Sequence, residues 1–200
     1  MNTDIKISNI SFARKIPVAS CQIKERETDN FKKATIYEYD CKDLSDIKDL
    51  ENLALTFDWE YAFEIMGHAY SKYYQTQKGD KVGQVFSMED EAGNIVGLCD
   101  TDRGEKTQIV YLEAHDRDKY CYIGQNFIAM LSKRALNHTK QSLTICDIQE
   151  SAMDFYKKTC GFKNFIKNDR ITNVEVPRHE LPQFIRQTEK RCGKIIDYKL

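Results

Sequence analysis

Glycine and proline are scarce in this sequence: it has nine glycines and three prolines among 200 residues, about half of their usual share. The scarcity excludes collagen-like repeats, flexible linkers and all-β folds with many tight turns. No stretch approaches the roughly 18 apolar residues of a membrane span, and the N-terminal segment MNTDIKISNI lacks the basic and apolar regions of a signal peptide. We therefore expect a cytoplasmic protein of long helices and strands, with no membrane partner.

The seven cysteines form no pattern of a metal site or a disulfide framework. Their number is odd, no CxxC pair occurs, and most of them have apolar neighbours. We predict reduced thiols that mostly fill the core, and no metal ion.

The net charge of −1 makes no electrostatic case for a nucleic acid partner. The charges are unevenly distributed, however. Residues 40–64 hold eight acids and two lysines, whereas the chain from residue 157 onward holds eleven Lys and Arg against five acids. Two solvated surface regions explain this pattern. The functional alternative is an acidic rim beside a cationic substrate and a basic rim beside an anionic cofactor.

The length and the 41% share of apolar residues predict a single folded domain over residues 1–200. Within it we distinguish an N-terminal extension (1–33), a core (34–176) and a C-terminal helix and tail (177–200).

Apolar periodicity predicts most of the helices and strands. The predicted elements are a strand at 34–39, helices at 44–57 and 58–73, an antiparallel meander of strands at 82–88, 94–100 and 107–114, a helix at 123–138, a strand at 142–148, a short helix at 152–160, a hairpin of strands at 162–168 and 171–176, and a terminal helix at 178–192. Ser151 and Asp154 predict a capping box for the short helix, and Gly161 predicts its end. Residues 1–33 receive no assignment.

The predicted class is α/β, called α+β in some schemes, with the element order β-α-α-β-β-β-α-β-α-β-β-α. Helices flank a mixed, mainly antiparallel sheet of about six to seven strands.

The junction between the predicted strand at 107–114 and the helix at 123–138 is a candidate anion site. A helix N-terminus presents unpaired N–H groups and a positive dipole end to phosphate. Gly124 permits close approach of a pyrophosphate to the backbone, and Lys119 adds positive charge. The alternative is an ordinary helix start whose glycine packs against the next strand.

Tyr156 on the short helix is a candidate general acid. A phenol has an unperturbed pKa of about 10, which suits it to protonate a leaving thiolate in an acyl transfer. The alternative is that Tyr156 and Phe155 are core aromatic residues at a helix–sheet contact.

Together these segments resemble the GNAT superfamily of N-acetyltransferases. The meander EDEAGNIVGLCD leads into IVYLEA as in that family. The stretch Lys119–Gly124 corresponds to the acetyl-CoA motif Gln/Arg-x-x-Gly-x-Gly/Ala. The stretch Ala152–Phe162 corresponds to Ala-x-x-φ-Tyr-x-x-x-Gly-Phe, where φ is apolar, with one extra residue before the glycine. The resemblance spans residues 82–176.

The resemblance implies a GNAT-like sheet and an acetyl-CoA-dependent N-acetyltransferase that transfers the acetyl group directly to a primary amine in a ternary complex. It implies that residues 112–114 bind the pantetheine arm, that amides of residues 119–125 bind the pyrophosphate, that Gln149 replaces a pantetheine-binding asparagine, and that Tyr156 is the general acid. The implied cofactor-binding set is Leu112, Glu113, Ala114, Lys119, Tyr120, Cys121, Tyr122, Ile123, Gly124, Gln125, Gln149 and Tyr156.

The sequence departs from the family pattern in three ways. Lys119 replaces Arg or Gln, and Tyr122 replaces the first glycine of the acetyl-CoA motif. Further, no acid occupies the usual positions of the general base. Glu113 is the nearest acid, and a β-bulge is needed to turn its side chain toward the acyl group. Asp147, His115 and a water relay are the other candidates.

The acceptor is expected to be the amine of a small molecule or of a protein. Trp59, Tyr61 and Glu64 lie in the acidic stretch and suit a protonated amine by charge and cation–π contact. The alternative is that Trp59 is a core residue and that the acids are solvated.

Other functions remain open at this stage. The chain fits a catalytically degenerate acyl-CoA-binding or protein-interaction module, or a toxin-like acetyltransferase of aminoacyl-tRNA that uses the basic C-terminal third. A covalent route through Cys121 or Cys146 lacks a neighbouring histidine in sequence. A homodimer is compatible with every one of these functions.

Overall fold

The computed structural model describes residues 15–39, 41–56, 62–103, 106–115, 118–137 and 142–199. Its elements in chain order are β1 (Ile16–Glu25), β2 (Phe31–Tyr39), α1 (Leu44–Thr56), α2 (Ala62–Gln77), β3 (Val85–Asp90), β4 (Ile95–Arg103), β5 (Thr107–Ala114), β6 (Tyr120–Cys121), α3 (Ile123–Asn137), β7 (Ser142–Ile145), a 3-10 turn (Glu150–Ala152), a π-helix (Phe155–Thr159), β8 (Phe165–Asn168), β9 (Ile171–Pro177), α4 (Leu181–Cys192) and β10 (Ile196–Asp197).

The strands form one mixed sheet in the order β10-β1-β2-β3-β4-β5-β7-β9-β8, with β6 paired to β1. Every pairing is antiparallel except the parallel pair β5–β7. The predicted class and the mainly antiparallel sheet are therefore confirmed. Within the described residues the sheet has ten strands, more than the predicted six to seven, because β1, β6 and β10 were not expected.

Strand β1 comes from the part of the sequence that received no assignment. A register shift between Pro17 and Ala19 interrupts its alternation, so both Val18 and Ala19 are fully buried. Regular alternation begins only with Cys21 and Ile23, and it covers too few residues to predict a strand by itself.

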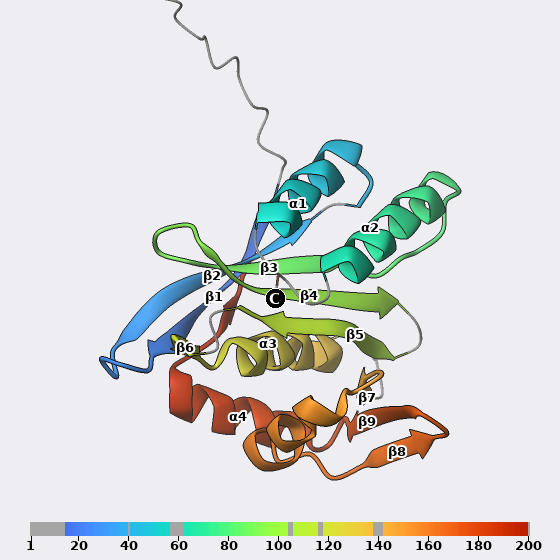
Figure 1. The fold of residues 1–200 in the computed structure, drawn as a ribbon. Helices are drawn as coiled ribbons and strands as arrows, with labels where there is room; N and C mark the ends of the chain where they lie inside the picture. The colour runs from blue at the N-terminus through green and yellow to red at the C-terminus, as the bar shows by residue number, and fades with distance from the viewer. Residues whose placement is uncertain are drawn as a thin grey trace, which may run out of the picture.

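The helices cover both faces of the sheet, as Figure 1 shows. On one face, Ile47 of α1 and Ile65 of α2 belong to a core cluster with residues of β3 and β4. On the other face, Phe127 of α3 and Phe184 of α4 belong to a larger cluster. Within the described ranges, no helix is both long enough and apolar enough to cross a membrane.

The segment before Gly161 differs from the predicted capped helix. Asp154 forms an exposed ion pair with Lys158 at 2.8 Å, and no side chain caps the 3-10 turn, so the capping box is wrong. The Cys160 amide donates to the Phe155 carbonyl at 2.9 Å, an i to i+5 bond. The π-helix thus accommodates the residue that is extra in the family motif. Gly161, with φ of 75°, ends the segment as predicted.

Buried charges connect α3 to strands β10 and β2. The Arg134 side chain donates to Asp197 on β10, with Nε at 2.8 Å and Nη2 at 3.3 Å from the carboxylate oxygens. Its Nη1 donates to Glu38 on β2 at 3.3 Å, and Lys199 donates to the same carboxylate at 2.7 Å. Arg134 is only 9% exposed, so water cannot replace these bonds efficiently.

Removing the Arg134 charge should therefore destabilise the fold strongly. Replacing Arg134 with Met leaves the buried carboxylate of Asp197 without its cation, and we expect a loss of about 3–5 kcal/mol in the free energy of unfolding. The exposed pair Lys158–Asp154 provides the control, since Lys158→Met should change the same free energy by less than about 0.5 kcal/mol. Urea denaturation measures both, and equal effects would contradict a structural role of the buried network.

Candidate functional site

Strands β5 and β7 are hydrogen-bonded only over a short distance and then diverge. Their parallel pairing ends at Ile109 and Ile145. The chain after β7 turns at Asp147, whose φ is 45°, and the Ile148 amide donates to the carbonyl of Thr172 on β9 at 2.7 Å. Among the described residues, the ladder between β5 and β7 therefore does not continue beyond Ile109.

A β-bulge turns the second half of β5. The register between β4 and β5 shifts so that Val110 is the extra residue. Ile109 and Leu112 both pack in the cluster on the α3–α4 side, whereas Tyr111 packs on the α1–α2 side. Glu113 lies on the face of Tyr111 because strand residues two positions apart share a face. The bulge needed to turn Glu113 is thus present.

The gap between the diverging strands forms a cavity of about 180 Å³, which we call the inner cavity. It is lined by residues 109–114, by residues 145–149, and by Ser151, Ala152 and Tyr156. It includes Leu112, Glu113, Ala114, Gln149 and Tyr156 of the expected site.

A second cavity of about 380 Å³, the outer cavity, continues from it beside the start of α3. It is lined by residues 120–125 and by Arg26, Leu112, Ala114, Ser151, Ala152, Phe155, Tyr156 and Thr159. The two cavities share Leu112, Ala114, Ser151, Ala152 and Tyr156. Of the twelve expected cofactor-binding residues, all except Lys119 line one cavity or both.

The N-terminus of α3 forms one wall of the outer cavity. The Tyr122 carbonyl accepts the first helical bond, from the Asn126 amide at 3.0 Å. The amides of Ile123, Gly124 and Gln125 therefore have no acceptor within the helix. Together with the positive end of the helix dipole, these donors suit a phosphate group.

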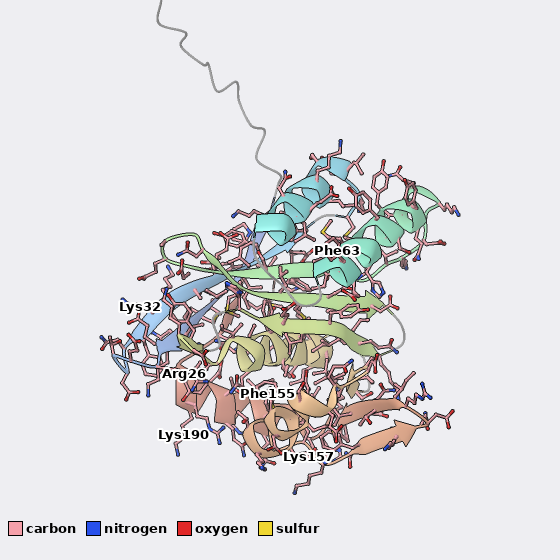
Figure 2. The ribbon with its side chains drawn as sticks, in the orientation of Figure 1. Arg26, Lys32, Phe63, Phe155, Lys157 and Lys190 are labelled. Atoms are coloured by element: carbon pink, nitrogen blue, oxygen red, sulfur yellow. The ribbon has the colours of Figure 1, made fainter. Side chains whose placement is uncertain are left out.

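Gly124 packs directly against the Phe155 side chain of the π-helix. A Cβ atom at this position would lie 2.9 Å from Cζ of Phe155, closer than such atoms approach in proteins. The glycine thus packs closely against the π-helix rather than against the next strand. Gly124 and Phe155 therefore lie side by side, and both line the outer cavity; Figure 2 labels Phe155.

Tyr156 lies where the two cavities meet. Its ring contacts Phe155 edge to face at 4.9 Å between centroids. Burial raises the pKa of the Tyr156 phenol well above its usual value, because desolvation penalises the phenolate. The phenol is therefore protonated at neutral pH.

The candidate bases occupy different places. Glu113 is buried, at 9% exposure, and lines the inner cavity. Asp147 lines the same cavity and is exposed. His115 lines neither cavity, and its amide donates to the Val96 carbonyl at 2.9 Å. The structure thus brings Glu113 and Asp147, but not His115, to the inner cavity.

The basic residue at the outer cavity is Arg26, which the sequence analysis did not single out. The Lys119 ammonium lies 4.9 Å from the centroid of the Tyr120 ring and outside both cavities. The Arg26 amide donates to the Lys119 carbonyl at 2.9 Å and so holds the β1–β2 turn against the loop before α3. Figure 2 shows Arg26 on this turn. Only the pairing of β1 with β6 brings it there, so no local motif predicts it.

The expected acceptor residues are only partly described. Trp59 and Tyr61 lie outside the described residues, and Glu64 is exposed in the first turn of α2. The pKa of Tyr111, which lines the inner cavity, is raised by burial and further by nearby carboxylates that include Glu64 and Asp147. Acidic groups thus surround the α1–α2 side of this cavity.

All seven cysteines are free thiols, and Cys121 and Cys146 are the two that are not fully buried. Burial and the charges of Asp102 and Asp147 raise the pKa of the Cys146 thiol, which disfavours the nucleophilic thiolate. Across the described part of the chain, no group of three or more His, Cys, Asp and Glu side chains could hold a metal ion.

Comparisons of sequence find no relative: no protein-family model and no curated protein matches this chain. Comparisons of structure do. A mutant of the AtaT toxin, bound to the C-terminus of the antitoxin AtaR and acetyl-CoA, has a TM-score of 0.52 and 14% identity, covering 77% of this chain and 99% of that one. The PaiA N-acetyltransferase of Thermoplasma acidophilum, in complex with coenzyme A, has a TM-score of 0.50 and 14% identity, covering 72% and 98%.

The spermidine N-acetyltransferase of Vibrio cholerae, in complex with CoA and spermine, has a TM-score of 0.50 and 12% identity, covering 74% of this chain and 98% of that one. At such identities the likeness concerns the fold. This chain has the fold of the GNAT-family N-acetyltransferases, as its sequence motifs suggested.

The close contact at Gly124 leads to a test. Gly124→Ala should lower the free energy of unfolding by about 1–3 kcal/mol, since the new methyl group overpacks against Phe155. Gly67 in α2 has no atom within 4 Å of a built Cβ, so Gly67→Ala should raise the same free energy by about 0.5–1 kcal/mol.

Urea denaturation of both variants, and of Gly124→Ala combined with Phe155→Leu, measures the effect. The smaller residue at position 155 should restore part of the lost stability. If the double variant is no more stable than Gly124→Ala, Phe155 is not the group that the methyl meets.

Proposed function

We propose that this protein is an acetyl-CoA-dependent N-acetyltransferase that transfers the acetyl group to a primary amine by direct attack in a ternary complex. The observation that carries the proposal is that the outer and inner cavities meet at Tyr156, Leu112 and Ala114. A thioester bound at this junction has its pantetheine arm in the outer cavity and its acetyl group facing the inner one. The GNAT fold supports the same arrangement.

The outer cavity is suited to coenzyme A. Beyond Ile109, where its pairing with β7 ends, β5 lines both cavities and lies where the amides of the pantetheine arm would run, and Gln149 lines the neighbouring cavity wall. The amides at the start of α3 face the diphosphate. Arg26 takes the role expected of Lys119, since it is the basic side chain that lines this cavity.

Tyr156 is proposed as the general acid. The amine attacks the carbonyl carbon, a C–N bond forms, and the C–S bond breaks with its electron pair remaining on sulfur. The leaving thiolate then takes a proton, which the Tyr156 hydroxyl supplies at the cavity junction. Burial keeps this phenol protonated until the thiolate forms.

Glu113 is proposed as the base that removes the proton of the attacking amine. The bulge at Val110 places it on the Tyr111 face of β5, and it lines the inner cavity. Asp147 is the alternative base on the same cavity. A covalent route through Cys146 is disfavoured because its thiol has a raised pKa.

We propose a cationic amine as the acceptor. The carboxylates of Glu64 and Asp147 influence Tyr111 at the inner cavity, and they attract a protonated amine before it is deprotonated for attack. Trp59 and Tyr61 precede α2 in sequence, and we propose that they contribute cation–π contacts.

Binding of acetyl-CoA tests the proposal first. At about 100 times its Kd, a ligand of the native state alone adds about 2.7 kcal/mol, so the melting temperature should rise by about 5–10 °C. A panel of primary amines should then release free CoA, measured as thiol. Stabilisation without release on any amine would instead favour a binding module, and no stabilisation would contradict both.

Tyr156→Phe tests the acid. Among the described residues the Tyr156 hydroxyl makes no hydrogen bond, so its loss should leave the fold and the acetyl-CoA-induced rise in melting temperature unchanged. Turnover should fall by about 100-fold. Tyr74→Phe makes the same chemical change at an exposed position of α2 and should leave turnover unchanged. An undiminished rate in Tyr156→Phe would remove this residue from the mechanism.

A further inference from the structure

Tyr122 holds a backbone conformation that a large side chain rarely adopts. Its φ is 73°, in the left-handed region. The other non-glycine residues described with positive φ are Asp29, Asp147 and Asp169, and aspartate tolerates this region far better than tyrosine does. Glycine or a short polar residue would thus form this turn with less strain. The shape of the turn therefore gives no reason for a tyrosine at position 122.

The conformation is imposed from both sides. Immediately before Tyr122, Cys121 pairs with Lys24 on β1. Immediately after it, the carbonyl of Tyr122 itself accepts the first hydrogen bond of α3, from the amide of Asn126. The chain passes from strand to helix within this single residue, so Tyr122 cannot relax without loss of one neighbour or the other. Strain held in this way is typical of functional positions.

The core does not account for the ring of Tyr122 either. Tyr120 and Phe155 pack in the core cluster on the α3–α4 side, and Tyr122 belongs to neither core cluster. The hydroxyl of Tyr120 donates to Asp90 at 3.3 Å. Tyr122, in contrast, is half-buried and lines the outer cavity.

The surroundings of the ring match a nucleotide. Arg26 lines the same cavity, and the amides of Ile123, Gly124 and Gln125 follow Tyr122 directly. Phosphates bind helix N-termini and arginine, while aromatic rings stack on nucleic acid bases. Tyr122 and Arg26 line only the outer cavity, so they lie away from the junction where the thioester is placed.

We propose that Tyr122 is a binding residue for the adenosine end of coenzyme A and that its strained conformation serves to place the ring against the adenine. This inference rests on the proposed function. The family motif has a glycine at this position. The motif alone would therefore predict tighter CoA binding with glycine than with tyrosine, and we propose the opposite.

Replacing the ring separates the two expectations. Tyr122→Gly and Tyr122→Asn keep the turn and remove the ring. Both should weaken CoA binding by about 10-fold, as expected for a lost stacking contact. Neither should change the affinity for 4′-phosphopantetheine, which lacks the adenosine, by more than about 2-fold. Tyr122→Phe keeps the ring and should bind CoA like the unmodified protein. Isothermal titration calorimetry measures all of these affinities.

The ligand-free variants test the strain. Tyr122→Gly should raise the melting temperature by about 2–4 °C, as relief of a left-handed tyrosine predicts. Asp169→Gly is the matched control: it changes an exposed residue of positive φ in the β8–β9 turn, outside both cavities, and should leave CoA affinity unchanged.

Distinct outcomes overturn distinct claims. If the unmodified protein does not bind CoA, the proposed function and this inference fail together. If it binds CoA and Tyr122→Gly binds equally well or more tightly, only this inference fails. Equal losses for CoA and 4′-phosphopantetheine would also overturn it, because the ring would then act on the part that both ligands share. A lower melting temperature of Tyr122→Gly would overturn the strain argument independently of any ligand.

Discussion

β5 and β7 part after Ile109, whose carbonyl still accepts from the Cys146 amide at 2.9 Å, because from Asp147 onward the chain gives its amide hydrogen bonds to β9. The Ile148 amide donates to Thr172, and the Asp147 amide donates to the Asn173 side chain at 2.8 Å. A parallel pair that ends in this way leaves a gap beside β5 within the sheet itself. The inner cavity fills the gap, and the outer cavity reaches it from the helix side.

Four backbone irregularities lie around these two cavities. Val110 forms the bulge in β5, and Asp147 and Tyr122 have positive φ. The π-helix Phe155–Thr159 adds one residue beside them. Each irregularity points a side chain or a row of amides into a cavity, which a regular strand or helix at the same place could not do. The networks that hold the fold, such as that of Arg134, lie elsewhere.

The charges around the cavities are of opposite sign. Arg26 and the start of α3 make the outer cavity favourable for phosphates. Carboxylates near Tyr111 make the α1–α2 side of the inner cavity favourable for a cation. In the proposed reaction, an anionic cofactor and a cationic acceptor would enter from different sides and meet at Tyr156. Attraction of each reactant to its own side lowers the chance of unproductive binding.

Local patterns in the sequence were enough to predict α1, α3, α4 and the meander of β3, β4 and β5, because the spacing of buried residues follows directly from helix and strand geometry. The same patterns, with the family motifs, singled out residues 112–114, 120–125 and Tyr156, which line the two cavities.

Features that depend on partners distant in sequence needed the tertiary structure. Strand β1 is recognisable only through its pairing with β2, β6 and β10, and Arg26 reaches the outer cavity only through that pairing. The face of Glu113 depends on a register shift against β4. The sequence by itself determined which segments line the cavities; the pairing of the strands decided which side chains meet there, because register is a property of two segments and not of one.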